Sequence, residues 1–265
     1  MTLFNYDKKH FVRAASDGLV GVDEAGRGCF AGPVVAGCVW VKRSFYENAT
    51  PVKRADFIND SKQISAETRE EVFALIQHWA SVGELIFSAG TSTVQEIDTL
   101  NILGATRLAM SRAIDGVLER AGTSAENAPF AIAGTTDTPL FADKKAWVPI
   151  LVDGRPLVPF AWRHEAVVHG DATSLAIALA SIVAKVTRDH LMCNFSEKFP
   201  HYHFESHKGY GTAEHIEALK TYGICELHRL KFLRNLAAAP DCEIPGLRDI
   251  LPIEPPAPPQ GEFDF

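Results

Sequence analysis

The chain of 265 residues carries a net charge of −7 and is 46% hydrophobic, the composition of an ordinary soluble protein that can bury its own core. No apolar run approaches the length of a membrane span, and residues 1–9 lack the basic-then-apolar order of a secretion signal. Five scattered cysteines without a Cys-x-x-Cys pair favour reduced, buried thiols over a zinc or redox site. We therefore expect a cytoplasmic, monomeric protein without a membrane partner.

The negative net charge argues against a nucleic-acid partner, but the charge is unevenly distributed. From residue 241 onward there are six acidic residues and one basic residue, Arg248. This segment therefore carries a net charge of about −5 and the rest of the chain only about −2. Seven prolines in residues 240–265 disfavour a packed element. The sequence therefore predicts a largely disordered or surface-draped tail over 240–265.

The first predicted strand, residues 18–22, leads directly into two acids and a glycine-framed arginine. The adjacent carboxylates of Asp23 and Glu24 are hard oxygen ligands of the kind that Mg²⁺ and Mn²⁺ prefer. In Gly26-Arg27-Gly28, the glycines let another backbone approach and the arginine offers a planar donor for phosphate. Because neighbouring side chains on a strand face opposite ways, we place both carboxylates at the exit of the strand, where they can converge.

Apolar periodicity and capping residues predict the remaining elements. Strands are expected over 33–41, 85–89, 147–152 and 165–169, and helices from 65, over 94–100, 102–118 and 174–199, and from 212 to 222. The second strand should pair antiparallel with the first across a short loop. The first half of 174–199 is apolar all round, which predicts that it is buried. Residues 121–145 are expected to form an irregular connection or insertion.

Two further aspartates, Asp153 and Asp171, each lie beside a glycine near the end of a short apolar strand. If these strands join the first in one sheet, four carboxylates, including Asp23 and Glu24, meet in a two-metal site. Such ions activate water and stabilise the leaving oxygen of a phosphodiester. Either aspartate alone is more simply a turn residue, and Asp171 could also cap the helix near 174. Their occurrence together with the first pair favours the metal site.

A group of histidines and basic residues lies between 185 and 231. The histidines are His190, His201, His203, His207, His215 and His228. Together with the lysines and arginines they could form a face for duplex phosphates, and a solvated helical surface is an equal alternative. Tyr210 lies between two glycines, where an aromatic ring is poorly placed for a core and well placed to stack.

Taken together, these motifs resemble bacterial ribonuclease HII, or type 2 ribonuclease H, over about residues 18–232. The matching residues are Asp23-Glu24-Ala25-Gly26-Arg27-Gly28 with Ala31-Gly32-Pro33-Val34-Val35, Asp60-Ser61-Lys62, Asn101-Ile102-Leu103 with Ala109-Met110, Val152-Asp153-Gly154, Gly170-Asp171, 180–189, and Lys208-Gly209-Tyr210-Gly211-Thr212 with His228-Arg229. A lone Asp-Glu pair is a weak signal, whereas this many motifs in order form a strong one.

The resemblance implies an α/β, RNase H-like fold with a five-stranded mixed sheet flanked by helices and a small C-terminal helical part. We accordingly expect a catalytic domain over 1–200, a substrate-binding helical part over 201–239 and the tail over 240–265. It implies an endoribonuclease that hydrolyses the RNA strand of RNA–DNA hybrids. Such an enzyme also nicks 5′ of single ribonucleotides in duplex DNA, leaving 3′-hydroxyl and 5′-phosphate ends, in ribonucleotide excision repair and DNA replication.

The resemblance also assigns roles. Asp23, Glu24, Asp153 and Asp171 match the acids that bind two Mg²⁺ or Mn²⁺ ions. Gly26, Arg27 and Gly28 match the loop that senses the ribose 2′-hydroxyl, and Tyr210 matches the tyrosine that packs on the following deoxyribose. Lys62 is a candidate phosphate contact. The 2′-hydroxyl is the physical means of telling RNA from DNA.

Some positions depart from the family pattern, and rival interpretations stay open. His169 and Arg155 stand where many relatives have lysine and asparagine, and the 121–145 connection is longer than expected. A non-catalytic hybrid-binding protein is one alternative, and a type 3 ribonuclease H that needs longer RNA stretches is another. Gln260–Phe265 loosely resembles a sliding-clamp docking tail, with an inert tail as the alternative.

Overall fold

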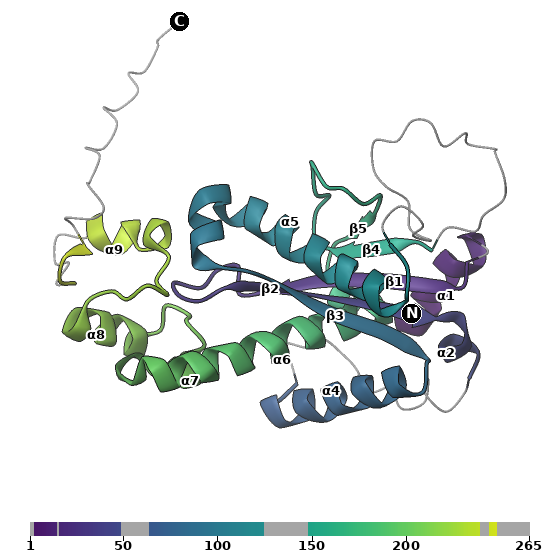
Figure 1. Cartoon of the computed structure of the whole chain (residues 1–265), viewed down its shortest axis with the longest axis horizontal. Helices are drawn as coiled ribbons and strands as arrows, with labels where there is room; N and C mark the ends of the chain where they lie inside the picture. Colours follow the sequence, from purple (N-terminus) through teal and green to yellow (C-terminus); the bar gives the residue numbers. More distant parts are fainter. Residues whose placement is uncertain (1–2, 15, 49–63, 125–147, 239–243, 248–265) are drawn as a thin grey trace, which may run out of the picture. The chain divides into compact units, whose positions relative to one another are not determined.

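The computed structural model describes residues 3–14, 16–48, 64–124, 148–238 and 244–247 (Figure 1). The chain divides into two compact units. The first comprises Met1–Arg27 and Pro33–Leu191, and the second comprises Gly28–Gly32 and Met192–Phe265. The functional division predicted at residues 200 and 240 stays a prediction. Each unit has its own hydrophobic core.

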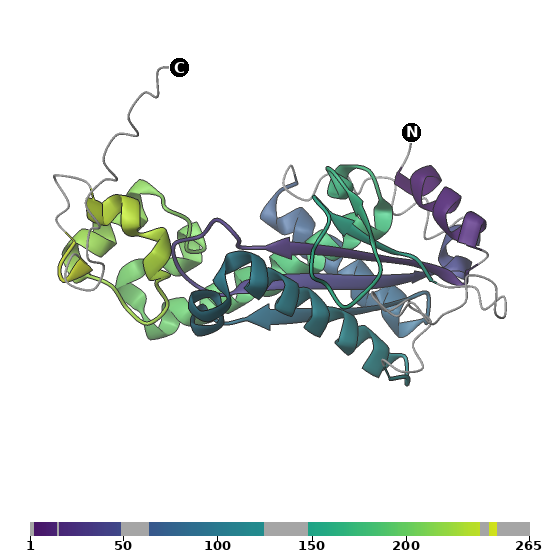
Figure 2. The same cartoon turned by 90° about the horizontal axis from the view of Figure 1, so that it is seen from above.

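A five-stranded mixed sheet in the order β3-β2-β1-β4-β5 forms the centre of the first unit, as predicted. Strands β1 (Gly18–Ala25), β2 (Val34–Lys42) and β3 (Leu85–Ser92) pair antiparallel, whereas β4 (Ile150–Asp153) and β5 (Glu165–Val167) are parallel to β1. Figure 2 shows β1, β2 and β3 side by side. The carboxyl ends of β1, β4 and β5 therefore meet at one edge region of the sheet.

Helices cover both faces of this sheet. These are α1 (Leu3–Ala14), α2 (Arg43–Glu47), α4 (Ala66–Ser81), α5 (Val94–Arg120), the short η2 (Gly170–Ala172) and α6 (Leu175–Lys198). Helix α5 lies on one face, and α4 and the first part of α6 lie on the other (Figure 1). None of the helices in the described ranges is long and apolar enough to cross a lipid bilayer.

Glycines let helices touch the sheet backbone directly. A Cβ on Gly21 in β1 would lie 2.1 Å from the carbonyl carbon of Ala176, and one on Gly37 in β2 would lie 2.1 Å from the carbonyl oxygen of Ala180. Both positions face α6, so no side chain separates this helix from the sheet. As predicted, the first half of α6 is buried.

A buried carboxylate holds the beginning of α6. Asp7 of α1 accepts hydrogen bonds through Oδ2 from the Ala176 backbone N–H at 2.9 Å and from the Tyr46 hydroxyl at 2.8 Å. An acceptor at a helix N-terminus satisfies N–H groups that have no partner within the helix. Burial is the main cause that raises the pKa of Asp7 to about 7.

Several local predictions are confirmed. Ser65 caps α4 by accepting from the Thr68 N–H, and Thr212 caps α8 (Ala213–Tyr222), which ends before Gly223. The two helices predicted over 94–118 form one element that breaks at Asn101, where φ is 59°. Most of the predicted 121–145 connection lies outside the described residues.

The second unit contains short helices around its own core. These are η3 (Pro200–Tyr202), α7 (Phe204–His207), α8, η4 (Leu230–Phe232) and α9 (Arg234–Ala238), joined by the end of α6. Ile244 and Leu247 are buried in this core. The expectation that the tail holds no packed element is therefore wrong at these residues, because two apolar side chains between the prolines reach the core. The rest of the tail lies outside the described ranges.

The predicted phosphate face is wrong for three of its histidines. His207, His215 and His228 are buried in the second unit; the His207 and His215 rings stack at 4.3 Å, and His215 Nε2 lies 3.1 Å from His228 Nε2. Burial lowers the pKa of His215 to about 4 and that of His228 to about 3. Short helices around one core place these rings inside, so they do not face solvent.

The neutral histidines make the second unit acid-sensitive. Both pKa values are lower in the folded than in the unfolded chain, so stability is lost as the pH falls below about 6.5, the usual histidine pKa. Between pH 7 and pH 5 we expect a loss of roughly 2–4 kcal/mol, measured by hydrogen exchange of the α8 amides.

Two variants provide controls for this pH dependence. His215→Phe removes one titrating ring and should flatten the slope, whereas replacing the exposed His78 of α4 by glutamine should leave it unchanged. Equal slopes in all three proteins would contradict the assignment.

Candidate active site

Strand β1 carries both acids of the first motif. Asp23 pairs with Gly37 and Glu24 with Ala36 in the β1–β2 ladder, which continues to Ala25. The strand was expected over 18–22; pairing with the antiparallel partner extends it by three residues to Ala25, and it ends before Gly26, where the turn was expected. Asp23 lies two residues beyond Gly21 and therefore shares its α6-facing side of the sheet.

Asp153 and Asp171 come from the neighbouring parallel strands. Val22 of β1 pairs with Val152 of β4, so Asp153, the last residue of β4, lies beside Asp23. Asp153 Oδ1 accepts a hydrogen bond of 2.6 Å from the Gly170 N–H. This bond holds the residue before the buried Asp171 against the end of β4. The structure thus brings the predicted acids to one end of the sheet.

Asp23 is the most strongly perturbed of these acids. Burial is the main cause that raises its pKa well above the ordinary aspartate value, and the negative charges of Glu24 and Asp153 raise it further. The Ser181 hydroxyl and the Glu24 N–H, which lies 2.7 Å from Oδ1, act in the opposite direction. Among the described residues, Oδ2 has no hydrogen-bond partner. A buried carboxylate therefore keeps an unpaired oxygen beside other acids.

This environment fits a divalent cation in its donor chemistry. Clustered carboxylate oxygens are the ligands of Mg²⁺ and Mn²⁺, and a cation would relieve both the repulsion and the unpaired oxygen of Asp23. Across the described residues, however, no three acid, histidine or cysteine side chains are already gathered as a metal site. The acids are therefore neighbours whose mutual repulsion a cation would relieve, and they do not form a complete set of metal ligands.

The Gly26-Arg27-Gly28 turn is held by a second arginine. The φ of Gly26 is +91°, and a Cβ there would lie 2.0 Å from Nε of Arg188 in α6. The Arg188 side chain is buried and donates from Nε to the Pro33 carbonyl at 3.0 Å. Arg27 pairs with Glu24 at 3.0 Å. Because Arg188 lies among other basic residues in the sequence, it was expected on the surface with them. The signal for its packing role was Gly26, whose missing side chain leaves room for the arginine.

Gly28 differs from Gly26. It begins the first segment of the second unit, and a Cβ there would meet nothing within 4 Å. The fold therefore does not require glycine at this position.

Tyr210 lies in the second unit with 43% of its surface exposed. The preceding Gly209 accepts hydrogen bonds through its carbonyl from the Phe30 N–H at 2.8 Å and from the Ala31 N–H at 3.3 Å. The segment that follows Gly28 and the loop that carries Tyr210 are thus bonded within this unit. Lys62, the predicted phosphate contact, lies outside the described residues.

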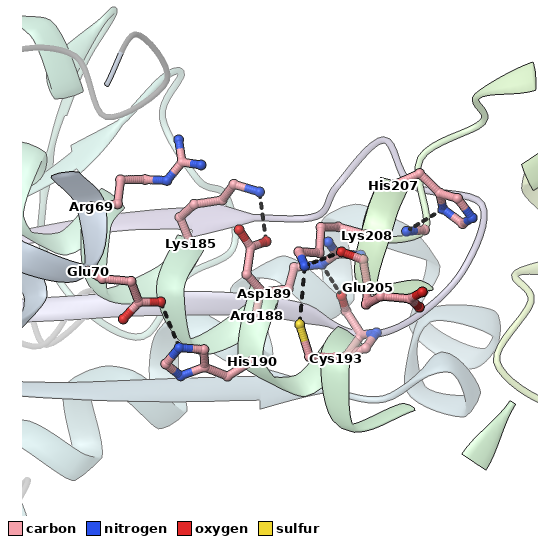
Figure 3. A network of polar contacts seen from close by, with 12 residues as sticks. Arg69, Glu70, Lys185, Arg188, Asp189, His190, Cys193, Glu205, His207 and Lys208 are labelled. Atoms are coloured by element: carbon pink, nitrogen blue, oxygen red, sulfur yellow. Dashed lines mark hydrogen bonds and ion pairs between the residues drawn. The ribbon is translucent and has the colours of Figure 1, made fainter. Parts of the chain in front are cut away.

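The polar surface of α6 is largely paired. In the first unit, Lys185 pairs with Asp189 and His190 pairs with Glu70, both at 2.7 Å (Figure 3). These pairs lie on exposed or half-buried positions, and such pairs contribute little to stability.

Ser181 is a site residue to which sequence reasoning gave no role. It lies in the buried part of α6 and bonds to Asp23. A hydroxyl within an otherwise apolar helical stretch was the available signal.

Comparison with known proteins gives a family match over most of the chain. A family model described as Ribonuclease HII matches residues 20–235. A Ribonuclease HII of Endomicrobium trichonymphae is 39% identical over 231 residues, which cover 87% of this chain and 91% of that protein.

Solved structures share the fold at lower identity. The PCNA:RNase HII complex from Archaeoglobus fulgidus has a TM-score of 0.55 at 20% identity and covers 80% of this chain and 93% of that chain. Bst-RNase HIII in complex with Mn²⁺ has a TM-score of 0.54 at 16% identity and covers 82% and 68% of the two chains. These matches support the predicted RNase H-like architecture.

Asp23→Asn should stabilise the protein in the absence of divalent cations. Because the pKa of Asp23 is raised in the folded state, ionisation of this residue costs stability progressively above the unfolded pKa. The amide keeps an acceptor for the Glu24 N–H and removes the buried charge. We expect a gain of about 1–3 kcal/mol at pH 7.5 in urea unfolding with EDTA present. A loss of stability would contradict the electrostatic description.

The two glycines of the turn should respond differently to alanine. Gly26→Ala forces a positive φ on a residue with a Cβ and displaces Arg188, so it should cost about 1–3 kcal/mol. Gly28→Ala meets open space and should change the unfolding free energy by less than about 0.5 kcal/mol. Thermal unfolding of both variants measures the contrast, and equal losses would refute it.

Proposed function

The chain belongs to the ribonuclease HII family, and from that premise we propose that it nicks duplex DNA on the 5′ side of single embedded ribonucleotides. Membership makes the protein a ribonuclease H, a hydrolase. The observation that carries the finer proposal is Asp23, a buried carboxylate beside Glu24 and Asp153, one oxygen of which has no partner in the described part of the chain. A fold tolerates such an uncompensated group where chemistry uses it.

We assign the metal-binding role to Asp23, Glu24, Asp153 and Asp171. Two bound Mg²⁺ or Mn²⁺ ions would supply an activated water and neutralise charge on the phosphate and its leaving oxygen. The Mn²⁺ complex of Bst-RNase HIII, a protein of the same fold, supports a divalent ion. Within this site, Ser181 and the Glu24 N–H bond to Asp23 and so fix the orientation of its carboxylate.

The products follow from which phosphorus–oxygen bond breaks. Water attacks the phosphorus on the 5′ side of the ribonucleotide, and the O3′ of the preceding nucleotide leaves with a proton. The upstream strand then ends in a 3′-hydroxyl, and the ribonucleotide keeps a 5′-phosphate. This outcome suits an early step of ribonucleotide excision repair or a related step in DNA replication.

Recognition is assigned to the glycine-arginine turn and to Tyr210. The open space at Gly28 leaves room for a sugar to approach its backbone, and Arg27 presents a donor fork to phosphate. Tyr210 is exposed and stands on a loop held by backbone bonds, which suits packing against a deoxyribose. We therefore propose that the second unit contributes substrate binding.

Two other partners and substrates remain as defined alternatives. A type 3 ribonuclease H would spare a single ribonucleotide and cut a run of four. The intact glycine-arginine-glycine turn favours the single ribonucleotide as the substrate.

The Archaeoglobus fulgidus neighbour is a complex of RNase HII with PCNA, which supports a sliding clamp as a candidate partner for Gln260–Phe265. Those residues lie outside the described ranges.

Cleavage of a duplex with one ribonucleotide tests the proposal. Wild type should give one nick with Mg²⁺ and none with EDTA. Asp23→Asn and Asp171→Asn should each lower kcat by roughly a thousandfold or more, because each loses a metal-ligating charge.

Glu47→Gln provides the matched control for this assay. Glu47 is an exposed acid paired with Arg43 on α2, so its variant loses one negative charge but should cleave like wild type. Full activity in either aspartate variant, or equal cleavage with EDTA, would refute the assigned mechanism. A wild type that binds the duplex without cutting it would favour a non-catalytic hybrid-binding protein.

A further inference from the structure

The buried histidines of the second unit form a chain of hydrogen bonds with defined tautomers. The Cys225 N–H donates to His228 Nδ1 at 2.8 Å, so the proton of that neutral ring is on Nε2. His228 Nε2–H then donates to His215 Nε2 at 3.1 Å, which leaves the proton of His215 on Nδ1. That Nδ1–H donates to the carbonyl of Tyr210 at 2.8 Å. The chain therefore runs in one direction and ends on the Tyr210 backbone.

His207, whose ring stacks on that of His215, bonds to the same loop. The Gly209 N–H donates to His207 Nδ1 at 3.1 Å, and His207 Nε2–H donates to the Tyr202 carbonyl at 2.6 Å. The Tyr210 N–H donates to the His207 carbonyl at 3.0 Å. Both backbone polar groups of Tyr210 are thus engaged by the histidines or their backbone.

The loop needs this support because its backbone is unusual. Lys208 and Gly209 both have positive φ, 51° and 81° respectively, and for a lysine that conformation costs energy. Lys208 Nζ donates to the Glu205 carbonyl and to Cys193 Sγ, which anchors the start of the loop (Figure 3). Such a conformation persists only when its surroundings hold it in place.

Phe30 packs against the opposite side of this arrangement. The Phe30 ring lies against Gly211, where a Cβ would be 2.3 Å from a ring carbon. The centroid of the same ring lies 6.2 Å from that of the His215 ring. The loop is therefore enclosed by aromatic and imidazole rings, while the Tyr210 side chain stays exposed.

We propose that His215, oriented by His228, is a positioning residue that sets the backbone of Tyr210 so that its ring meets the deoxyribose beyond the ribonucleotide. The inference rests on the proposed function, because it assigns His215 a role through Tyr210. Without the Nδ1 donor, the Tyr210 carbonyl loses this imidazole partner, while the bond from the Thr212 N–H stays. A small displacement of a substrate-positioning group is enough to lower the rate strongly.

A double-mutant cycle distinguishes positioning from general stabilisation. His215→Phe keeps an aromatic ring in the same core and removes the donor; it should lower kcat/KM on a single-ribonucleotide duplex roughly tenfold. In a Tyr210→Ala background, the same change should lower kcat/KM by less than about twofold, because its effect passes through the tyrosine.

Two further variants complete the design. His215→Asn places an amide donor near the Nδ1 position and should restore most of the activity that phenylalanine loses. Tyr202→Phe removes a hydroxyl that bonds to the Gly223 carbonyl in the same core, outside the histidine chain, and should leave kcat/KM unchanged at a comparable loss of stability. If His215→Phe does not fold, His228→Asn takes its place in the cycle, because it removes the donor to His215 and keeps an amide oxygen that can accept from the Cys225 N–H.

The outcomes separate this inference from the proposed function. Equal fold losses from His215→Phe in both backgrounds, or failure of His215→Asn to recover activity, would overturn the positioning role while leaving the nuclease intact. Wild-type activity in Tyr210→Ala would overturn the role of the tyrosine and the inference with it. Absence of any cleavage by wild type would overturn the proposed function itself and everything that rests on it.

Discussion

The direct contact between α6 and the sheet is the constraint on which the acidic site depends. At Gly21 and Gly37 the helix backbone lies where side chains would otherwise stand, so Ser181 on the next part of α6 reaches Asp23. The same proximity removes water from that carboxylate, which is the first cause of its raised pKa. A side chain at either glycine would separate helix from sheet and return Asp23 to water. The electrostatics of the site are therefore a consequence of backbone packing.

Asp23 in the first unit and the three buried histidines in the second differ in how their polar atoms are paired. In the first, Asp23 keeps an oxygen without a partner among the described residues, and neighbouring acids add repulsion. In the second, each ring nitrogen of His207, His215 and His228 has a hydrogen-bond partner. An unsatisfied group is costly unless a ligand completes it, and a satisfied network holds a single geometry. The contrast fits the proposed metal-binding role of Asp23 and the proposed positioning role of the histidines.

The five-stranded sheet was predicted through the resemblance to a known family, and the grouping of the acids was predicted on the condition that their strands lie side by side. Because β1 and β4 are parallel neighbours, the condition holds for Asp23 and Asp153. Sequence reasoning failed where tertiary packing decides the structure. Pairing with β2 carries β1 three residues beyond Val22, where the apolar pattern of the strand stops. His215 and His228 lie in short helices and turns without a readable apolar period, so their burial was hidden among polar neighbours.

Arg188 and the histidine chain show why a recognition turn needs support from distant residues. A turn rich in glycine has many accessible conformations, and ordering it costs entropy that its own sequence cannot repay. In the first unit, Arg188 fills the space beside Gly26 and is fixed by the Pro33 carbonyl. In the second, Gly209 accepts from the segment that begins at Gly28, and the imidazoles hold Tyr210. Each half of the predicted ribose-sensing apparatus is thus ordered by its own unit. Substrate binding need not offset the entropy cost of ordering it. More of the binding free energy is then available to discriminate ribose from deoxyribose.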